Sequence, residues 1–477
     1  MMQDLRTWLE AVENIGQLEV VSGAHWNLEM GALVGLVAGK QEHPALLFDK
    51  IPDYEKGGRV LGCAMTTPGR VAVTFDIQGN PNHYELAEEF RQKLPGWEKG
   101  MRSFPPKAVN QAAFLENIQT GKDINLWTFP SPLWCELDIG RYIGTGDAVV
   151  TRDPDTGEIN VGTYRIMVHD EKTLGLFIAP GKHGRIHVEK YRSRGQDCPV
   201  AVSFGHHPLV FGIAALEVPS GAEYNFLGAV RNEPYPVFIE EITGLPVPAD
   251  SEIIVVGRSP AGKTREEGPF SEWTGYYASK QAQAPIIEVE RVYYRHNPVI
   301  LGVPNSNPAQ SAYFRYYRGV IKSAMLHNEL EKAGLVGVRA VSISEAFGEQ
   351  WVVVSITQRY AGHAKQAALL ASQSRSSVHM GRYVVVVDDD IDPRDIDEVI
   401  WAICTRSDPV QDIDIIRRTW SSPLDPIIRK PAEAFFNSRG IIDACKPFEW
   451  KDEFPKEIIM DQELAKRVKG KWGDIFV

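Results

Sequence analysis

Glu266-Glu267-Gly268-Pro269-Phe270-Ser271-Glu272-Trp273 is an acidic stretch that holds three carboxylates within seven residues. The Gly-Pro pair predicts a turn, because Gly accepts unusual backbone angles and Pro fixes φ. Glu267 and Glu272 then lie on a bent loop, where two carboxylates can converge on one point. Such a pair suits acid–base chemistry in which one carboxyl group is ionised and the other carries a proton. The alternative is an acidic loop that only faces solvent.

The composition fits a soluble globular protein of two or three domains. The chain has 477 residues, and domains average about 150 residues. Its net charge of −11 argues against nucleic-acid binding or a membrane-surface role, which would favour a basic face. No run of about 20 apolar residues predicts a membrane span, and the first residues lack the features of a signal peptide.

The five cysteines are scattered and include no Cys-x-x-Cys pair. This pattern predicts neither a zinc site nor a disulfide framework. We therefore expect a reduced, cytoplasmic protein.

The order of apolar and polar residues predicts an α/β (α+β) chain of three units. Helices and short strands alternate over roughly the first hundred residues, beginning with an amphipathic helix, which favours an α/β unit. From about Leu126, many short strands with turns between them, including one over 236–240, favour a barrel-like antiparallel domain, interrupted by helices near 183–194 and 222–231. After residue 308 the α/β pattern returns, with strands predicted over 338–343 and 351–356, and residues 461–471 predict a terminal helix.

A predicted strand over 159–168 carries two candidate site residues. Asn160 offers an amide oxygen, a hard ligand that suits Mg²⁺ or Mn²⁺, and Arg165 offers a planar fork for a carboxylate. They are five residues apart and would face opposite sides of a regular strand. A bend at Gly162 would therefore be needed to bring both to one cavity. The alternative is an Asn in a hairpin and an Arg at the surface.

Predicted helix starts carry the other candidates. His183 lies in Gly181-Lys182-His183-Gly184, where the glycines let a phosphate approach backbone N–H groups. Glu223 begins the next helix. The side chains of Asn160, His183 and Glu223 offer N and O donors and would form a divalent metal site if the fold brought them together. Alternatively, His183 is structural and Glu223 supplies only favourable first-turn charge. Lys365 opens a later helix and either reaches a phosphate or faces solvent.

These motifs, taken in order, resemble the UbiD family of reversible decarboxylases, which use prenylated flavin mononucleotide (FMN). They are Asn-x-Gly-x-Tyr-Arg at 160–165, Gly-Lys-His at 181–183, Ala-Glu-Tyr at 222–224, Glu-Gly-Pro-Phe-x-Glu at 267–272, Gly-His-Ala-Lys at 362–365 and Thr-Arg-x-Asp-Pro at 405–409. Each motif is short, and their common order over most of the chain carries the resemblance.

The resemblance implies four parts and an oligomer. These are an N-terminal α/β domain (1–120), a central split β-barrel that binds the flavin (121–300), a C-terminal α/β oligomerisation domain (301–455) and a terminal helix (456–477). In this family the terminal helix often docks on a partner subunit. We therefore expect a homodimer or a homohexamer.

The resemblance also implies the site residues. Arg165, Glu267 and Glu272 match the catalytic set. Asn160, His183 and Glu223 match the ligands of a divalent metal, Mn²⁺ or Mg²⁺, that clamps the cofactor phosphate, and a nearby K⁺ is typical. Trp273 is a candidate wall of the substrate pocket or, equally, part of the scaffold. The implied cofactor-binding residues are Asn160, Thr163, Tyr164, Arg165, Lys182, His183, Glu223 and Lys365.

The implied activity is that of a carboxy-lyase. It would reversibly and non-oxidatively decarboxylate an aromatic, heteroaromatic or α,β-unsaturated acid through a covalent prenylated-FMN adduct, which supplies an electron sink. Arg165 would hold Glu267 ionised, and Glu272 would return a proton after CO₂ leaves. A flavin prenyltransferase would supply the cofactor.

Two alternatives stand beside this activity. One is a decarboxylase of a larger conjugate such as an aryl thioester. The other is a non-catalytic flavin- or metal-binding subunit of a carboxylase complex, against which the intact Arg-Glu-Glu set argues.

Overall fold

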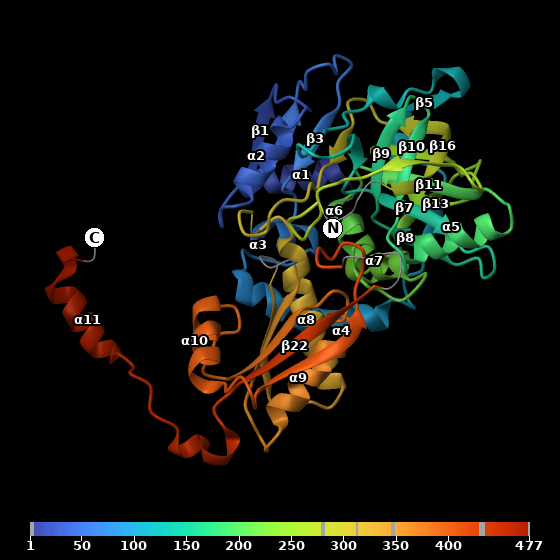
Figure 1. Ribbon diagram of the computed structural model, residues 1–477. Helices are drawn as coiled ribbons and strands as arrows, with labels where there is room; N and C mark the ends of the chain where they lie inside the picture. Colours follow the sequence, from blue (N-terminus) through green and yellow to red (C-terminus); the bar gives the residue numbers. More distant parts are fainter. Residues whose placement is uncertain (1–3, 278–281, 312, 345–348, 429–434, 476–477) are drawn as a thin grey trace.

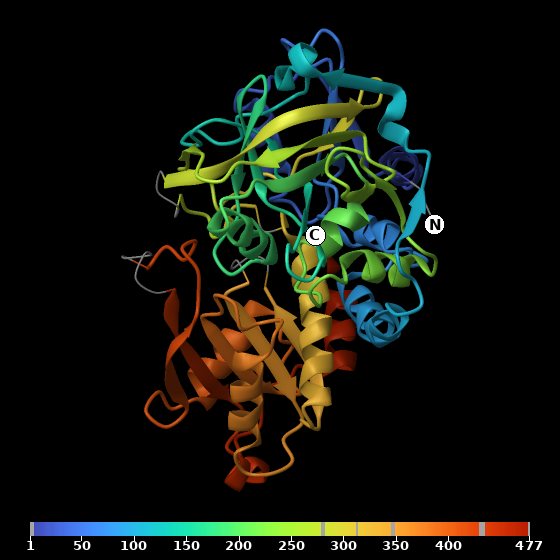
Figure 2. The same cartoon turned by 90° about the vertical axis from the view of Figure 1, so that its right-hand side faces the viewer.

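The computed structural model describes residues 4–277, 282–311, 313–344, 349–428 and 435–475. The N-terminal and central elements form one body, the C-terminal sheet forms a second, and the end of the chain reaches away from both (Figure 1). Helix α8 (Tyr316–Lys332) joins the two bodies, since it packs on α4 (His83–Gly100) and on β18 (Val338–Ile343) (Figure 2). Among the described residues, no helix has both the length and the apolar character that a membrane span requires.

The N-terminal unit is a four-stranded sheet covered by helices. Its strand order is β1-β2-β3-β17, and the strands are β1 (Leu18–Ser22), β2 (Ala45–Asp49), β3 (Arg59–Gly62) and β17 (Val299–Leu301). The last strand pairs with β3 although the whole central domain separates them in sequence, so the chain returns to its first unit before entering the C-terminal one. Its other helices are α1 (Leu5–Asn14), α2 (Glu29–Val37) and α3 (Pro68–Thr74).

Helix α1 shows how the sequence sets this unit. The Asp4 side chain accepts a hydrogen bond from the Thr7 backbone N–H, which caps the first turn. Leu5, Trp8, Leu9 and Val12 are buried and fix α1 against the core, whereas Ile15, the last apolar residue at this helical spacing, is exposed. Trp8 also donates its indole N–H to Thr74 of α3 at 2.9 Å.

The central unit is a ten-stranded sheet, which confirms the predicted split barrel. The main path is β6-β9-β10-β16-β14-β11-β7-β8, and β5 and β15 also pair with β16. The strands are β5 (Asn117–Thr120), β6 (Arg141–Gly144), β7 (Ala148–Arg152), β8 (Ile159–Gly162), β9 (Arg165–Asp170), β10 (Thr173–Phe177), β11 (Cys198–Phe204), β14 (Ile253–Ser259), β15 (Thr264–Glu267) and β16 (Ala282–Tyr294).

The connection between β8 and β9 explains why this sheet curls. Strand β8 lies at one end of the main path and β9 is second from the other end, yet only Thr163 and Tyr164 separate them in sequence. A two-residue link between strands so far apart in the sheet requires the sheet to bend into a half-barrel. The single strand predicted over 159–168 is therefore wrong, and the bend required near Gly162 is present. A Cβ on Gly162 would lie 2.4 Å from the Tyr164 hydroxyl oxygen, so the close approach needs glycine.

Helices α5 (His183–Ser193), α6 (Pro208–Ala214) and α7 (Glu223–Arg231) complete the central unit. A small sheet of order β13-β12-β4 lies beside them, made of β4 (Lys107–Val109), β12 (Pro236–Ile239) and β13 (Pro246–Pro248). The strand predicted over 236–240 thus belongs to this small sheet and not to the barrel.

The C-terminal unit is a five-stranded sheet of order β18-β19-β20-β22-β21. Its further strands are β19 (Trp351–Ile356), β20 (Tyr383–Asp388), β21 (Ile413–Trp420) and β22 (Phe436–Ala444), and its helices are α9 (His363–Gln373) and α10 (Ile396–Arg406). The terminal helix, α11 (Gln462–Lys471), buries none of its residues and extends from the body (Figure 1).

Candidate active site

A cavity of about 400 Å³ lies between the open side of the half-barrel and the C-terminal unit. Its walls come from the β8–β9 link, from the starts of α5 and α7, from the beginning of α8 and from residues of the C-terminal unit, including Trp420 and Ser422. Most of the predicted site residues line it: Asn160, Thr163, Tyr164, Arg165, Lys182, His183, Glu223, Glu272 and Trp273.

Arg165, at the start of β9, joins the two predicted catalytic carboxylates. Its Nε and Nη2 donate to Glu267 at 2.5 and 2.6 Å, and its Nη1 donates to Glu272 at 2.5 Å. The sequence argument paired Arg165 with Glu267 alone, so the contact with Glu272 is new. Burial opposes the charge on Arg165, but the carboxylates of Glu272 and Glu267 outweigh it and raise the pKa of the guanidinium.

The surroundings distinguish Glu267 from Glu272. The Tyr142 hydroxyl also donates to Glu267, at 3.0 Å, and Glu267 does not line the cavity. Glu272 is buried but does line it. The guanidinium of Arg165 lies over the rings of Phe177 and Phe270, 3.9 and 4.7 Å from their centroids, so the ion pairs have apolar surroundings.

The acidic loop is held from both sides. Glu267 ends β15, and the next turn contains a cis peptide bond between Gly268 and Pro269. The Ser271 N–H donates to Asp138 at 2.7 Å, and its carbonyl accepts from the Asn305 side chain at 2.9 Å. Burial raises the pKa of the Asp138 carboxyl to about 6. These contacts fix the loop that carries Glu272, and sequence reasoning missed them because Asp138 is far away in the chain.

The three predicted metal ligands share one wall of the cavity. His183 and Glu223 are the first residues of α5 and α7, and Asn160 lies on β8. Glu223 is buried, and its Oε2 has no hydrogen-bond partner among the described residues. Burial raises the pKa of the Glu223 carboxyl to about 7. A buried acceptor without a donor is what a cation would satisfy, so these residues fit a divalent metal.

Among the described residues, no three or more His, Cys, Asp or Glu side chains lie together in an arrangement that could hold a metal ion. The predicted ligand set has only two side chains of these kinds, and the third is the amide of Asn160. Tyr164 supports this wall, because its hydroxyl accepts from the Asn160 amide and from the Gly184 N–H, both at 3.2 Å.

Lys365 lies apart from the other candidates. It is on α9, does not line the cavity and forms an ion pair with Asp414 of β21. The structure therefore does not bring it to the predicted phosphate site.

Sequence reasoning missed three cations, one directly before α8 and two on it. Arg315, the residue before α8, and Arg318 and Lys322 all contact Glu349, at 2.6, 2.7 and 2.9 Å. Their spacing of three and four residues places them on one helix face, and this spacing could have predicted the cationic cluster from the sequence. Glu349 could not have been found, because its role depends on a tertiary contact.

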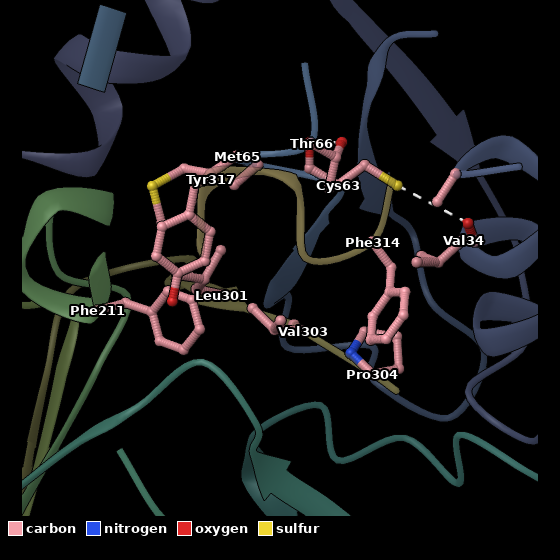
Figure 3. A pocket seen from close by; sticks show the side chains of 13 residues that line it. Val34, Cys63, Met65, Thr66, Phe211, Leu301, Val303, Pro304, Phe314 and Tyr317 are labelled. Carbon is pink, nitrogen blue, oxygen red and sulfur yellow. Dashed lines mark hydrogen bonds between the residues drawn. The ribbon is translucent and has the colours of Figure 1, made fainter. Parts of the chain in front are cut away.

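Trp273 lines the cavity and contacts this cationic cluster. The guanidinium carbon of Arg315 lies 4.7 Å from the centroid of its ring. A second, much smaller apolar hollow, drawn in Figure 3, shares part of its lining with the cavity. Phe211, Val303, Phe314 and Tyr317 line both spaces and so form the wall between them.

Known proteins resemble this chain along nearly all of its length. Residues 9–90, 107–308 and 315–444 match the N-terminal, Rift-related and C-terminal domains of 3-octaprenyl-4-hydroxybenzoate carboxy-lyase. A phenolic acid decarboxylase of Streptomyces sp. (strain D7) is 31% identical over 455 residues, which cover 93% of this chain and 92% of that protein. A pyrrole-2-carboxylic acid decarboxylase of Pseudomonas aeruginosa is 28% identical over 495 residues, covering 99% and 98%.

A solved structure agrees with these matches. The UbiD-class enzyme HmfF from Pelotomaculum thermopropionicum, in complex with FMN, is 26% identical with a TM-score of 0.84, covering 98% of this chain and 100% of that one. An evolved dimeric form of the same enzyme, in complex with prFMN, is 25% identical with a TM-score of 0.81 over the same shares. Because three domains match in order and a relative above 30% identity spans nearly the whole chain, the protein belongs to the UbiD family of prenylated-FMN-dependent reversible decarboxylases and is a carboxy-lyase.

Proposed function

We propose that this protein catalyses the reversible, non-oxidative decarboxylation of an aromatic or heteroaromatic carboxylic acid with prenylated FMN as its cofactor. The observation that carries the proposal is Arg165, which is fixed between Glu267 and Glu272 at the wall of the cavity. Relatives named as decarboxylases of phenolic acids and of pyrrole-2-carboxylic acid support this substrate class. The substrate class that the family resemblance predicts also includes α,β-unsaturated acids.

Asn160, His183 and Glu223 would hold Mn²⁺ or Mg²⁺, and the metal would clamp the cofactor phosphate. The partnerless Oε2 of Glu223 supports this assignment, and Lys182 beside His183 adds positive charge for the phosphate. When bound, the prenylated flavin supplies the electron sink that a ring carbanion lacks.

The chain's own residues have two tasks in this proposal. Arg165 holds Glu267 as an anion and fixes Glu272 at the cavity wall. As the bond to the carboxyl group breaks, CO₂ leaves and its electron pair stays with the substrate. Glu272 then donates its proton to the ring carbon and is reprotonated from water. The buried loop contacts preorganise this proton transfer.

A substrate screen tests the proposal. The protein, co-expressed with a flavin prenyltransferase, is given a panel of aromatic and heteroaromatic acids and the corresponding aryl thioesters. We expect CO₂ and the decarboxylated ring from at least one free acid. Release only from thioesters would favour a conjugate decarboxylase, and no release by fully loaded protein would favour a non-catalytic subunit.

A further inference from the structure

A row of charged side chains follows one wall of the cavity. It begins at Lys182, whose Nζ lies 3.9 Å from Glu217. Glu217 also lies 3.5 Å from Arg318 and 3.9 Å from Lys322, and both of these cations contact Glu349. Arg315 ends the row, because its Nη2 donates to Glu349 at 2.6 Å. The row thus connects the phosphate side of the site with the residues around Trp273.

The charges in this row do not balance. Four cations, Lys182, Arg315, Arg318 and Lys322, stand against the carboxylates of Glu217 and Glu349. Arg318 and Lys322 each lie within 4.0 Å of both carboxylates. Among the carboxylates of the described residues, Arg315 pairs with Glu349 alone, and it shares Glu349 with the other two cations. The positive excess therefore falls on the two ends of the row, and a partly buried cation without its own counter-ion favours an anion beside it.

Each end of the row faces a different part of the cavity. Lys182 precedes His183, so its charge belongs with the proposed metal and phosphate. Arg315 lies over the ring of Trp273, which follows Glu272 in sequence, and Glu272 and Trp273 both line the cavity. Arg315 is therefore at the end where the substrate ring would lie.

Arg315 is held in place but keeps donors to spare. The Trp273 ring covers one face of the guanidinium, and Nη2 donates a hydrogen bond to Glu349. Among the described residues, Nε has no partner, and no hydrogen bond from Nη1 is found. Burial lowers the pKa of the Arg315 guanidinium. A fixed cation with free donors is suited to bind an acceptor in the cavity.

We propose that Arg315 determines specificity by binding a second carboxylate on the substrate ring. This inference rests on the proposed function and names its substrate class as aromatic or heteroaromatic dicarboxylic acids. A phenolic hydroxyl has a pKa of about 10 and stays neutral near pH 7, so it would not balance the charge, whereas a carboxylate is ionised. Guanidinium also matches the planar geometry of a carboxylate. One carboxyl group is lost near Glu272, and the other remains bound to Arg315.

The test compares acids that differ in one group. Benzoate, 4-hydroxybenzoate and benzene-1,4-dicarboxylate form one series, and pyrrole-2-carboxylate and pyrrole-2,5-dicarboxylate form another. The variants are Arg315→Gln, Arg315→Lys and the control Arg318→Gln. The control removes the same charge from a residue that pairs with both Glu217 and Glu349. The measurements are kcat/KM, the dissociation constant of each acid by calorimetry, and prenylated flavin per chain.

We expect the wild-type protein to prefer the diacid of each series that it accepts. Arg315→Gln should lower this preference about 10- to 100-fold, the worth of one charge-assisted contact, mainly through KM and the dissociation constant. Arg315→Lys should restore part of it. Arg318→Gln should leave the preference unchanged, and flavin content should be the same in Arg315→Gln and wild type.

Three outcomes would overturn this inference. They are a wild type that binds and converts mono- and diacids equally well, an Arg315→Gln variant that weakens both kinds of acid alike, and loss of flavin from that variant, which would assign Arg315 to the phosphate. None of these touches the proposed function, which fails if no free acid is decarboxylated or if turnover does not require prenylated FMN. If turnover is absent on these rings, the calorimetric preference for the diacid and its loss in Arg315→Gln still decide the role of Arg315.

Discussion

Arg165 and Glu267 are joined by a two-point ion pair, with Nε and Nη2 of the guanidinium 2.5 and 2.6 Å from the two carboxylate oxygens. Tyr142 adds a third donor to Glu267, whereas Arg165 reaches Glu272 through Nη1. Glu267 lies outside the lining of the cavity, and Glu272 is the carboxyl that faces the cavity. This asymmetry supports Glu272 as the proton donor.

Glu272→Gln should lower turnover about 10²- to 10⁴-fold, because it keeps the size of the side chain and removes the transferable proton. Substrate binding should persist. The variant should also slow the exchange of the product's ring hydrogen with solvent deuterium, since exchange uses the same proton transfer. Turnover and exchange by mass spectrometry provide the measurement, and Glu267→Gln provides the comparison. If Glu272→Gln keeps both activities while Glu267→Gln abolishes them, the two roles are reversed.

His183→Ala should remove most of the divalent metal and of the prenylated flavin, because one lost ligand weakens a shared metal–phosphate clamp. Changes around metal sites cost about 10- to 100-fold in affinity. His187, one turn later on α5, bonds to Thr151 and does not line the cavity, so His187→Gln is the matched control. Elemental analysis for Mn, Mg and K and mass spectrometry of the flavin decide the matter. Full metal and flavin in His183→Ala would exclude His183 as a ligand.

Strands with a clear run of apolar or alternating residues could be predicted from the sequence. The strands predicted over 338–343 and 351–356 coincide with β18 and β19. Strand β22 was missed, since Arg439 within it is buried and donates to backbone carbonyls such as those of Gly381 and Val378. Helix α6 was also missed, because it is buried on all sides and so lacks an amphipathic period.

The site could be predicted only in part, for the same physical reason. Residue type and order suggested Asn160, Arg165, His183 and Glu223, and the resemblance gave their roles. The sequence required a bend at Gly162 but could not show that Thr163 and Tyr164 join the terminal strand β8 to β9, which is second from the other end of the sheet. Contacts between distant segments, such as Asp138 with Ser271, leave no local pattern.

Asp138→Asn should change the pH dependence of stability. Burial raises the pKa of Asp138 from 3.8 to about 6, so the folded state holds a proton that the unfolded chain releases more easily. The stability of the wild type is therefore lost as pH rises from about 4 to about 6, by up to about 3 kcal/mol from this group. Asn stays neutral, so the stability of the variant relative to the wild type should increase as pH rises over this range. Melting temperatures at pH 4.5 and 7.5 check this, with the exposed Asp123→Asn as control. A difference in melting temperature between Asp138→Asn and the wild type that does not vary with pH would refute it.

The terminal segment should dock on a second copy of the chain. Ile458, Ile459 and Met460 are exposed, and a ten-residue helix that buries nothing is not stable alone in water. We expect a homodimer or homohexamer by light scattering, with weaker association after removal of residues 456–477. A fully active monomer at working concentration would contradict this expectation.

Cofactor dependence of decarboxylation tests the central claim most directly. The best acid from the screen is given to two preparations of the protein, one made with a flavin prenyltransferase and one made without it, and CO₂ release is measured per chain. We predict turnover only in the first preparation, in proportion to its content of prenylated flavin. Equal turnover in both preparations, or none from protein fully loaded with prenylated flavin, would contradict the account.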